Sequence, residues 1–240
     1  MSLTLVKDYS VSQPWLVYSL DQAYVSSFYK QVANQQTLFG TGDVYCGRSS
    51  QVNRSHRCCV DLKDVTLARK LGRKIQSLVD LQLNEMVQKL GVTDFKFDKV
   101  DFLCSSYRDG YFFKVHKDLV LLDPNPRVIS WVFYFHREPR TFSGGDLVFY
   151  DQGKELGRMA SESGLLVVFR SDLSHEVTPV SCPSRDFRDS RFALSGFIRT
   201  KPTFKSTVLS RARYVVRDPR LQGIRQMKAS AFSLLRRSML

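Results

Sequence analysis

The chain has 240 residues, 43% of them hydrophobic, which is typical of one large globular domain or of a domain with an appendage. No apolar run approaches the roughly 18–20 residues that a membrane-spanning helix needs, and the opening residues lack the pattern of a signal peptide. These features argue against a transmembrane protein and predict a cytoplasmic one.

The formal net charge of +13 is distributed unevenly. Residues 1–100 carry 13 basic and 9 acidic groups, residues 101–200 carry 13 of each, and residues 201–240 carry 10 against one. The excess of basic residues therefore belongs mainly to a C-terminal segment.

The cysteines are odd in number, and no CxxC spacing suggests a zinc site. Only two of them are close in sequence, and those two are adjacent, which disfavours a disulfide between them. The pattern predicts free thiols in a reducing compartment for Cys46, Cys58, Cys59, Cys104 and Cys182.

Residues 1–60 mix short apolar runs with polar, glycine-containing stretches and predict short helices or strands and a long loop. From Asp64, which suits an N-cap, to Leu90 the apolar residues recur mostly at spacings of three to four. This periodicity predicts a helix, with Gly91 behind it as a stop signal. Its apolar stripe must pack on something, and a sheet is the obvious candidate.

The next hundred residues consist of short apolar or alternating runs separated by Gly, Pro, Asp, Asn and Ser clusters. Many short strands with no helix between them indicate a β-sandwich or barrel preceded by helices. The predicted strands are FKFDKVDFLCSSY, YFFKVH, RVISWVFYF, GDLVFY, GLLVVF, HEVTPV and RFALSGFIR.

Two residues of one strand-like run, His116 and Asp118, have the residue types and spacing of metal ligands. Because they lie two positions apart, a strand would point both side chains to the same face. Among the other histidines, His175 is the best third ligand, since it follows a buried-looking strand and a short polar turn. Two histidines and one aspartate form the facial triad of non-haem iron oxygenases, which leaves positions open for co-substrate and oxygen.

From about Lys99 to Arg199 the sequence resembles the prolyl 4-hydroxylase-like branch of the 2-oxoglutarate/Fe(II) oxygenases. The order of its motifs matches the order typical of that branch. The matching elements are Tyr107, Gly110, Phe113, HKD at 116–118, Arg127 with Ser130, FYF at 133–135, SGG at 143–145, GLLVVF at 164–169, HEVTPV at 175–180 and Arg191-Phe192.

The resemblance implies an α+β, mainly β protein with a double-stranded β-helix core of the jelly-roll, cupin-like type. We expect residues 1–98 to be a helical and strand support region of the same domain, and residues 99–200 to be the catalytic core. Residues 201–240 are expected to be a basic, helical C-terminal extension.

The resemblance also implies a binding site for 2-oxoglutarate. Arg191 would hold its distal carboxylate through two parallel charge-assisted hydrogen bonds, and Ser195 lies on the same strand face. Tyr107 and Tyr134 match tyrosines that line this pocket in related enzymes. A polar insertion, CPSRDFRDS, separates His175 from Arg191, so Arg185 and Arg188 are rival anchors. Arg191 is preferred because it opens an alternating strand.

The implied function is hydroxylation of an unactivated C–H bond on an amino-acid residue of a peptide or protein. The implied cofactor is Fe(II), the co-substrates are 2-oxoglutarate and O2, the co-products are succinate and CO2, and ascorbate is a candidate reductant.

Three alternatives remain open. The first is a hydroxylase of free amino acids or small metabolites. The second is a nucleic-acid demethylase of the same superfamily, although RFALSGFIR lacks the Asn and Thr arrangement of that group's RxNxTxR-like string. The third is a catalytically silent binding module.

The basic segment 201–240 has its own set of candidate partners. An acidic protein, RNA or an anionic membrane surface would suit its charge. A helix that covers the catalytic domain and keeps its basic side in solvent is the simpler interpretation.

Overall fold

The computed structural model describes residues 3–8, 14–45, 50–119, 123 and 125–202. The expected helical extension therefore lies outside the described residues, apart from its first two positions, and so does Cys46. The four described cysteines carry free thiols, as the sequence predicts. None of the helices in the described ranges is long and apolar enough to cross a membrane.

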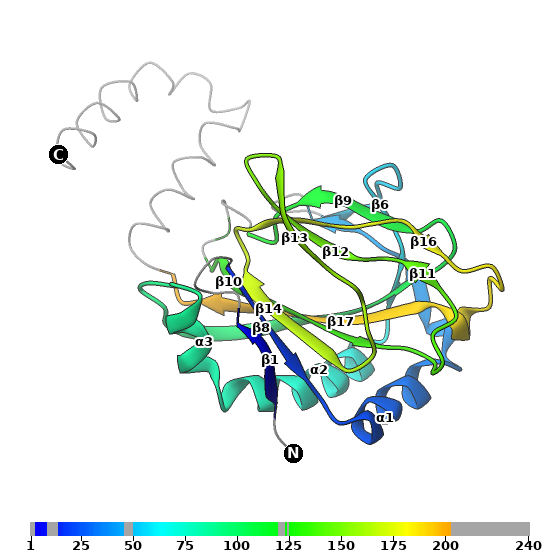
Figure 1. Cartoon of the computed structure of the whole chain (residues 1–240), viewed down its shortest axis with the longest axis horizontal. Coiled ribbons are helices and arrows are strands. Elements are labelled where there is room, and N and C mark those ends of the chain that lie inside the picture. Colours follow the sequence, from blue (N-terminus) through cyan, green and yellow to red (C-terminus); the bar gives the residue numbers. More distant parts are fainter. Residues whose placement is uncertain (1–2, 9–13, 46–49, 120–122, 124, 203–240) are drawn as a thin grey trace, which may run out of the picture.

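In the part of the chain that the structure describes, the α-helices lie before residue 90 and strands follow them (Figure 1). In order they are β1 (Thr4–Asp8), β2 (Trp15–Ser19), α1 (Gln22–Val32), β3 (Phe39–Thr41), β4 (Val44–Tyr45), β5 (Ser50–Gln51), β6 (Arg57–Cys58), β7 (Val60–Leu62), α2 (Val65–Asp80), α3 (Leu83–Lys89), β8 (Phe97–Tyr107), β9 (Phe112–His116), β10 (Arg127–Phe135), β11 (Ser143–Gly144), β12 (Leu147–Asp151), β13 (Lys154–Met159), β14 (Leu165–Arg170), β15 (Ser174–Val177), β16 (Val180–Ser181) and β17 (Arg191–Thr200).

Two antiparallel sheets form the framework. The large sheet has the order β1-β2-β14-β10-β17-β8-β7-β3, and the small sheet has the order β13-β12-β15-β9-β6. From β8 to β17 the chain passes back and forth between them, because β8, β10, β14 and β17 lie in the large sheet and β9, β12, β13 and β15 in the small one. This alternation is the double-stranded β-helix that the sequence predicts.

The first 98 residues contribute to both sheets. β1 and β2 extend one edge of the large sheet, β7 and β3 extend the other edge, and β6 extends the small sheet. The short strands of residues 1–60, which the sequence does not place, therefore complete the two sheets.

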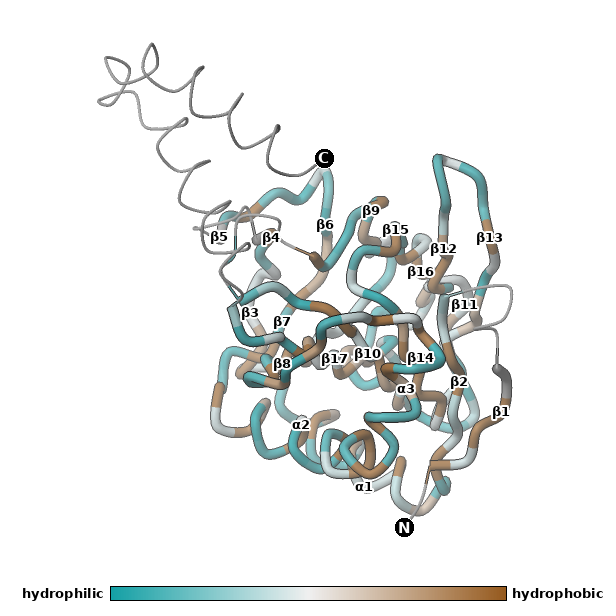
Figure 2. Tube along the Cα trace, turned by 90° about the vertical axis from the view of Figure 1, so that its left-hand side faces the viewer, coloured by the Kyte–Doolittle hydropathy of each residue, from teal (hydrophilic) through white to brown (hydrophobic). Residues whose placement is uncertain are grey.

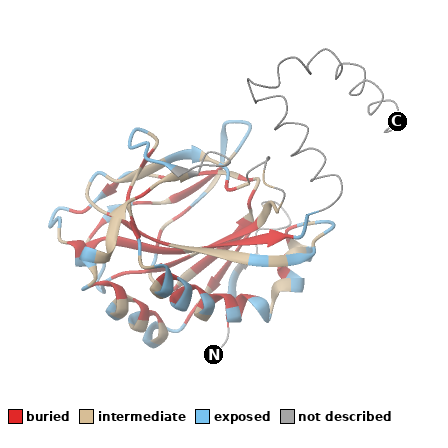
Figure 3. Ribbon diagram, turned by 180° about the vertical axis from the view of Figure 1, so that it is seen from behind, coloured by how far each residue is buried: buried red, intermediate tan, exposed pale blue. Residues whose placement is uncertain are grey.

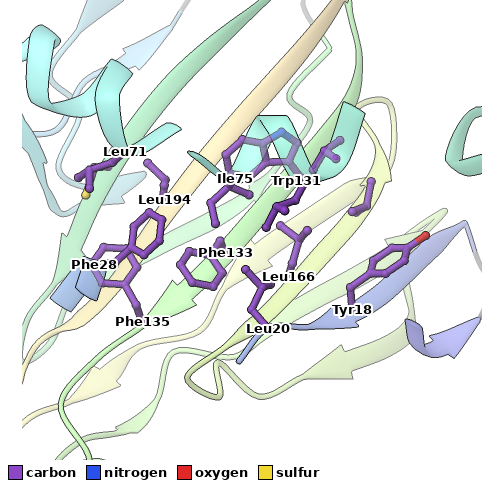
Figure 4. Packing of buried hydrophobic residues seen from close by; sticks show 14 of the residues in the cluster. Tyr18, Leu20, Phe28, Leu71, Ile75, Trp131, Phe133, Phe135, Leu166 and Leu194 are labelled. Carbon is purple, nitrogen blue, oxygen red and sulfur yellow. The ribbon is translucent and has the colours of Figure 1, made fainter. Parts of the chain in front are cut away.

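The molecule has three layers, which Figure 2 shows edge-on: helices, large sheet and small sheet. The helices pack on the outer face of the large sheet through apolar residues such as Phe28, Leu71 and Ile75, which meet Phe133 and Leu194 (Figure 4). Each such side chain stabilises the fold by roughly 1.5–3 kcal/mol. The outward faces of the helices remain exposed (Figure 3).

The helix expected from Asp64 to Leu90 is interrupted near its middle. Asp64 caps it as predicted, since its side chain accepts a hydrogen bond from Leu67 N. Gly91 follows the last turn with a positive φ of 63°. α2 and α3 are separated at Leu81 and Gln82, where Leu81 is 77% exposed. The chain changes direction between α2 and α3 (Figure 1). This change lets the apolar residues after the break, such as Met86, reach the core.

All seven strands expected after residue 95 are present, with HEVTPV divided between β15 and β16, but the sequence does not predict the two-residue β11 or the longer β13. β13 forms a hairpin with β12, in which Asp151 pairs with Lys154 and leaves a two-residue turn. Both turn residues, Gln152 and Gly153, have positive φ, as tight hairpin turns require. The run KELGRM lacks the apolar alternation that predicts a strand, because it is largely polar and exposed.

One glycine of the central strand β17 is required by packing. A Cβ on Gly196 would lie 2.0 Å from the ring of Trp131, which is buried and donates a hydrogen bond to Gln76. We expect Gly196→Ala to lower the free energy of unfolding by about 1–3 kcal/mol, measured by urea denaturation. Gly40→Ala is the control, because its Cβ would meet only the flexible Lys63 side chain. Equal stability of the two variants would contradict this account.

Candidate active site

A pocket of about 300 Å³ opens between the two sheets. Its walls come from the inner faces of β8, β10 and β17 on one side and of β9, β12 and β15 on the other. Along β17 the odd-numbered residues Arg191, Ala193, Ser195 and Phe197 line the pocket, whereas the even-numbered Phe192, Leu194 and Ile198 belong to the core under the helices. Strand alternation thus assigns one face of β17 to the site.

The pairing of β9 with β15 brings the two candidate histidine ligands together. His116 lies directly opposite His175 in the antiparallel register. The Nε2 atoms of His116 and His175 lie 3.8 Å and 3.6 Å from the two carboxylate oxygens of Asp118. The potential ligand atoms of these three residues all lie within 4.8 Å of one another.

Backbone carbonyls orient both imidazole rings. Nδ1 of His116 lies 2.8 Å from Lys114 O, and Nδ1 of His175 lies 2.9 Å from Leu173 O. Because a carbonyl can only accept, each Nδ1 must donate, and each Nε2 then presents a lone pair to the cluster. The pKa of His116 is held well below its usual value, mainly by burial and next by the neighbouring His175. The lowered pKa favours this neutral form.

Asp118 reaches the cluster by a different route from the one expected. The sequence predicts His116 and Asp118 in one strand, whereas β9 ends at His116 and Asp118 follows it in a loop. Leu119 N donates to Ser171 O, which ties this loop to the chain just before β15. The loop, rather than strand alternation, directs the buried carboxylate towards the histidines.

Arg191 lines the pocket and is 1% exposed. Its Nε donates to Gly145 O at 2.7 Å, while Nη1 is buried and has no hydrogen-bond partner among the described residues. The guanidinium carbon lies 4.9 Å from the ring centres of both Tyr107 and Tyr134. A buried guanidinium with an unused donor is a site for a carboxylate.

Tyr107, Tyr134 and Ser195, which the sequence analysis associated with Arg191, all line the same pocket. The hydroxyl of Tyr134 is buried without a hydrogen-bond partner among the described residues. Burial raises the pKa of Tyr134 to about 12 and raises that of Tyr107 as well. Both phenols are therefore protonated donors at neutral pH.

The rival anchors Arg185 and Arg188 are exposed and lie outside the pocket. Arg185 contacts Asp109 at 3.4 Å, and Arg188 forms an ion pair with Asp186. Their side chains are 79% and 59% exposed. The insertion is anchored by the buried Cys182 and Phe187 and directs both arginines into solvent, and β17 begins at Arg191.

Gly145 makes the position of Arg191 possible. This residue, the last of the SGG motif, has a positive φ of 68°, and a Cβ there would lie 2.5 Å from Cδ of Arg191. Its carbonyl is the acceptor for Arg191 Nε. The SGG motif thus leaves space for the Arg191 side chain and accepts its Nε hydrogen bond.

The N-terminal region supplies a wall of the pocket that sequence reasoning did not assign. Arg57 binds both carboxylate oxygens of Asp61 at 2.8 Å and donates to Asp43 O at 2.6 Å. Its guanidinium lies 5.2 Å from the centre of Phe113, which stacks on His116 at 3.5 Å between ring centres. No sequence motif identifies Arg57 as a pocket residue. It lies 42 positions before Lys99, where the resemblance begins.

Comparisons with known proteins agree with this geometry. Residues 102–199 match the family model of the 2OG-Fe(II) oxygenase superfamily. A PKHD-type hydroxylase of Synechocystis sp. is 30% identical over 140 residues, which cover 55% of this chain and 46% of that protein. The chain therefore spans about half the length of this curated relative.

Two solved structures share the fold. A prolyl 4-hydroxylase of Pseudomonas putida is 19% identical with a TM-score of 0.58, over 81% of this chain and 96% of that one. A prolyl hydroxylase of Trichoplax adhaerens, solved with a hypoxia inducible factor peptide, is 18% identical with a TM-score of 0.63, over 84% and 89%. Residues 102–199 thus resemble the 2-oxoglutarate/Fe(II) oxygenase class, and the chain shares the fold of these two prolyl hydroxylases.

The residues present fit the Fe(II) and 2-oxoglutarate that this class uses together with O2. Two imidazole Nε2 atoms and one carboxylate form the donor set of a facial triad, and the carbonyls behind both rings fix their orientation. The unused donors of Arg191 and Tyr134 fit the distal carboxylate of 2-oxoglutarate.

We expect His116→Ala to weaken Fe(II) binding by more than about 100-fold, since loss of even an outer-shell partner costs about 10–100-fold. Anaerobic calorimetric titration with Fe(II) would measure this. His56→Ala is the control, because His56 lines the pocket but lies outside the three-residue cluster. An unchanged Fe(II) affinity in His116→Ala would remove this residue from the ligand set.

We expect Gly145→Ala to displace Arg191 and weaken 2-oxoglutarate binding while Fe(II) binding persists. Titration of the iron-loaded protein with 2-oxoglutarate would separate the two effects. Gly153→Ala is a matched control, because Gly153 also has a positive φ but its Cβ would meet nothing within 4 Å. Equal losses in both variants would attribute the effect to backbone strain.

Proposed function

We propose that this protein is an Fe(II)- and 2-oxoglutarate-dependent hydroxylase that acts on an amino-acid residue of a peptide or protein. The proposal rests chiefly on one arrangement: the cluster of His116, Asp118 and His175 shares a pocket with the buried, partly unsatisfied Arg191. A metal site and a carboxylate site within one cavity are what this chemistry requires.

In this proposal His116, Asp118 and His175 are the metal ligands. The two histidines present Nε2 without having to lose a proton, because Nδ1 carries it, and the carboxylate of Asp118 offsets part of the metal's charge. When bound, the ferrous iron supplies the activation of O2 that turns a substrate C–H into C–OH, with 2-oxoglutarate converted to succinate and CO2.

Arg191 is proposed to hold the distal carboxylate of 2-oxoglutarate, with Tyr134 and Tyr107 as further donors and Ser195 beside them. The low polarity around Arg191 strengthens these bonds, because water cannot compete for the charge. Apolar pocket residues such as Val132, Leu147 and Val177 exclude water from the space between the anchor and the metal ligands.

The size of the pocket favours a substrate that inserts a single side chain. A volume of about 300 Å³ is at the low end of the roughly 300–1,000 Å³ typical of ligand sites, and 2-oxoglutarate would take part of it. The structural relative from Trichoplax adhaerens was solved with a peptide of hypoxia inducible factor. Both observations support a peptide or protein substrate.

We expect the iron-loaded protein to release succinate from 2-oxoglutarate, and Arg191→Met to raise the KM for 2-oxoglutarate by at least about tenfold. One hydrogen bond to a charged group contributes about 1.5–3 kcal/mol. Arg188→Met is the control, because Arg188 is exposed and paired with Asp186. An effect of Arg188→Met without one of Arg191→Met would relocate the anchor.

Mass spectrometry distinguishes the substrate classes. A peptide library incubated with the protein, Fe(II) and 2-oxoglutarate should yield products heavier by one oxygen atom, and Arg191→Met should abolish them at low 2-oxoglutarate. Oxygenation of free amino acids alone would favour the small-molecule alternative. Absence of both succinate release and 2-oxoglutarate binding would overturn the proposal.

A further inference from the structure

The edge of the large sheet beside α2 is open over most of one strand. β17 pairs with β8 from Phe97 to Tyr107, but on the other side β7 pairs with β8 only at Ser105 and Ser106. Among the described residues, 97–104 have no strand partner on that side. An open strand edge presents a row of backbone donors and acceptors, which another extended chain can pair with.

A groove of about 530 Å³ follows this edge, between β8 and the first half of α2. Val100 and Phe102 face α2, whereas Leu103 faces the pocket between the sheets, and all three line the groove. Residues from both faces of one strand can line the same groove only along the strand's edge. The groove therefore lies where an added strand would continue the sheet.

The walls of the groove are apolar and its rim is basic. Leu62, Val65 and Ala68 join the β8 residues, and Val65 is 57% exposed. Lys63, Arg69 and Arg73 are exposed along the rim. Neither Arg69 nor Arg73 forms an ion pair with another described residue, so both positive charges are available.

The acidic residue in the groove does not cancel this charge. Asp101 accepts a hydrogen bond from Arg199 Nε at 2.6 Å, and Arg127 Nη2 lies 4.0 Å from the same carboxylate oxygen. Asp64, at the start of α2, is occupied as the helix N-cap. The rim facing solvent is therefore net positive.

We infer that this groove binds an extended acidic segment of a partner protein, which adds a strand antiparallel or parallel to β8 over residues 97–104. Backbone hydrogen bonds to the edge provide the pairing, alternate apolar side chains enter the groove, and acidic side chains meet Arg69 and Arg73. The site is separate from the proposed hydroxylase pocket, and the inference does not require that activity.

Other occupants fit less well. Residues 201–240 of this chain carry ten basic residues against one acidic residue, so their charge repels the rim. The groove of a second copy of this chain has the same positive rim, so two such grooves would repel each other. A nucleic acid would satisfy the charge, but its sugar–phosphate backbone has no N–H and C=O groups to pair with a strand edge.

The test uses the full-length protein and a fluorescein-labelled peptide of alternating valine and glutamate, about eight residues long to match the open edge. Binding is followed by fluorescence anisotropy in about 0.15 M salt, where the Debye length is about 8 Å. We expect Arg69→Glu/Arg73→Glu to weaken binding by at least about tenfold, because two attractive pairs become repulsive.

Lys70→Glu/Lys74→Glu is the matched control. It makes the same change of charge on the same helix, but neither lysine lines the groove. We expect it to change the affinity by less than about threefold, since neither side chain lines the groove to pair with the peptide and salt weakens the remaining long-range attraction. Equal losses in the two double variants would overturn the inference, because they would indicate attraction by net charge alone.

Amide hydrogen exchange tests the pairing itself in the unaltered protein. We expect the peptide to slow exchange within residues 97–104, and the same peptide with central prolines to bind weakly and protect little, because proline has no N–H to donate. Binding without protection of 97–104 would overturn the inference. Equally tight binding of a single-stranded RNA of the same charge would also overturn it.

Discussion

The antiparallel pairing of β9 with β15 is the interaction on which the candidate active site depends. It sets His116 opposite His175, so that two rings from positions far apart in the sequence present Nε2 to one point. A shift of this register by one residue would turn one histidine to the other face of the sheet. Carbonyls at Lys114 and Leu173 then fix the two rings.

The other half of the site depends on β17, at the centre of the opposite sheet. One face of this strand packs under the helices and the other carries Arg191 into the pocket. Because β17 is held between β8 and β10, Arg191 cannot withdraw towards solvent. Burying a guanidinium is costly unless it is paired, so the unsatisfied Nη1 of Arg191 favours an anionic ligand in the pocket.

The N-terminal region shapes the site as well as supporting it. Arg57 forms a buried ion pair with Asp61 of strand β7. Its guanidinium also contacts the ring of Phe113, which stacks on His116 in the pocket wall. The same region leaves β8 partly uncovered, because the chain turns from β7 into α2 after Leu62. Strand β8 thus lines the pocket with one face and has an open edge over most of its length.

The sequence by itself determined most of the strands from β8 to β17, the capped start and glycine stop of the helical region, the three residues proposed for the metal, and the candidates for 2-oxoglutarate, with Arg191 as the preferred anchor. These follow from local periodicity and ordered motifs, which a linear reading can detect.

Only the tertiary structure decided which residues meet. The choice of Arg191 over Arg185 and Arg188 as the pocket arginine, the loop position of Asp118, the wall formed by Arg57 and the break between α2 and α3 all depend on contacts between distant segments. Such contacts leave no periodic signal. They arise because two sheets must close around one core, and that closure fixes where each side chain points.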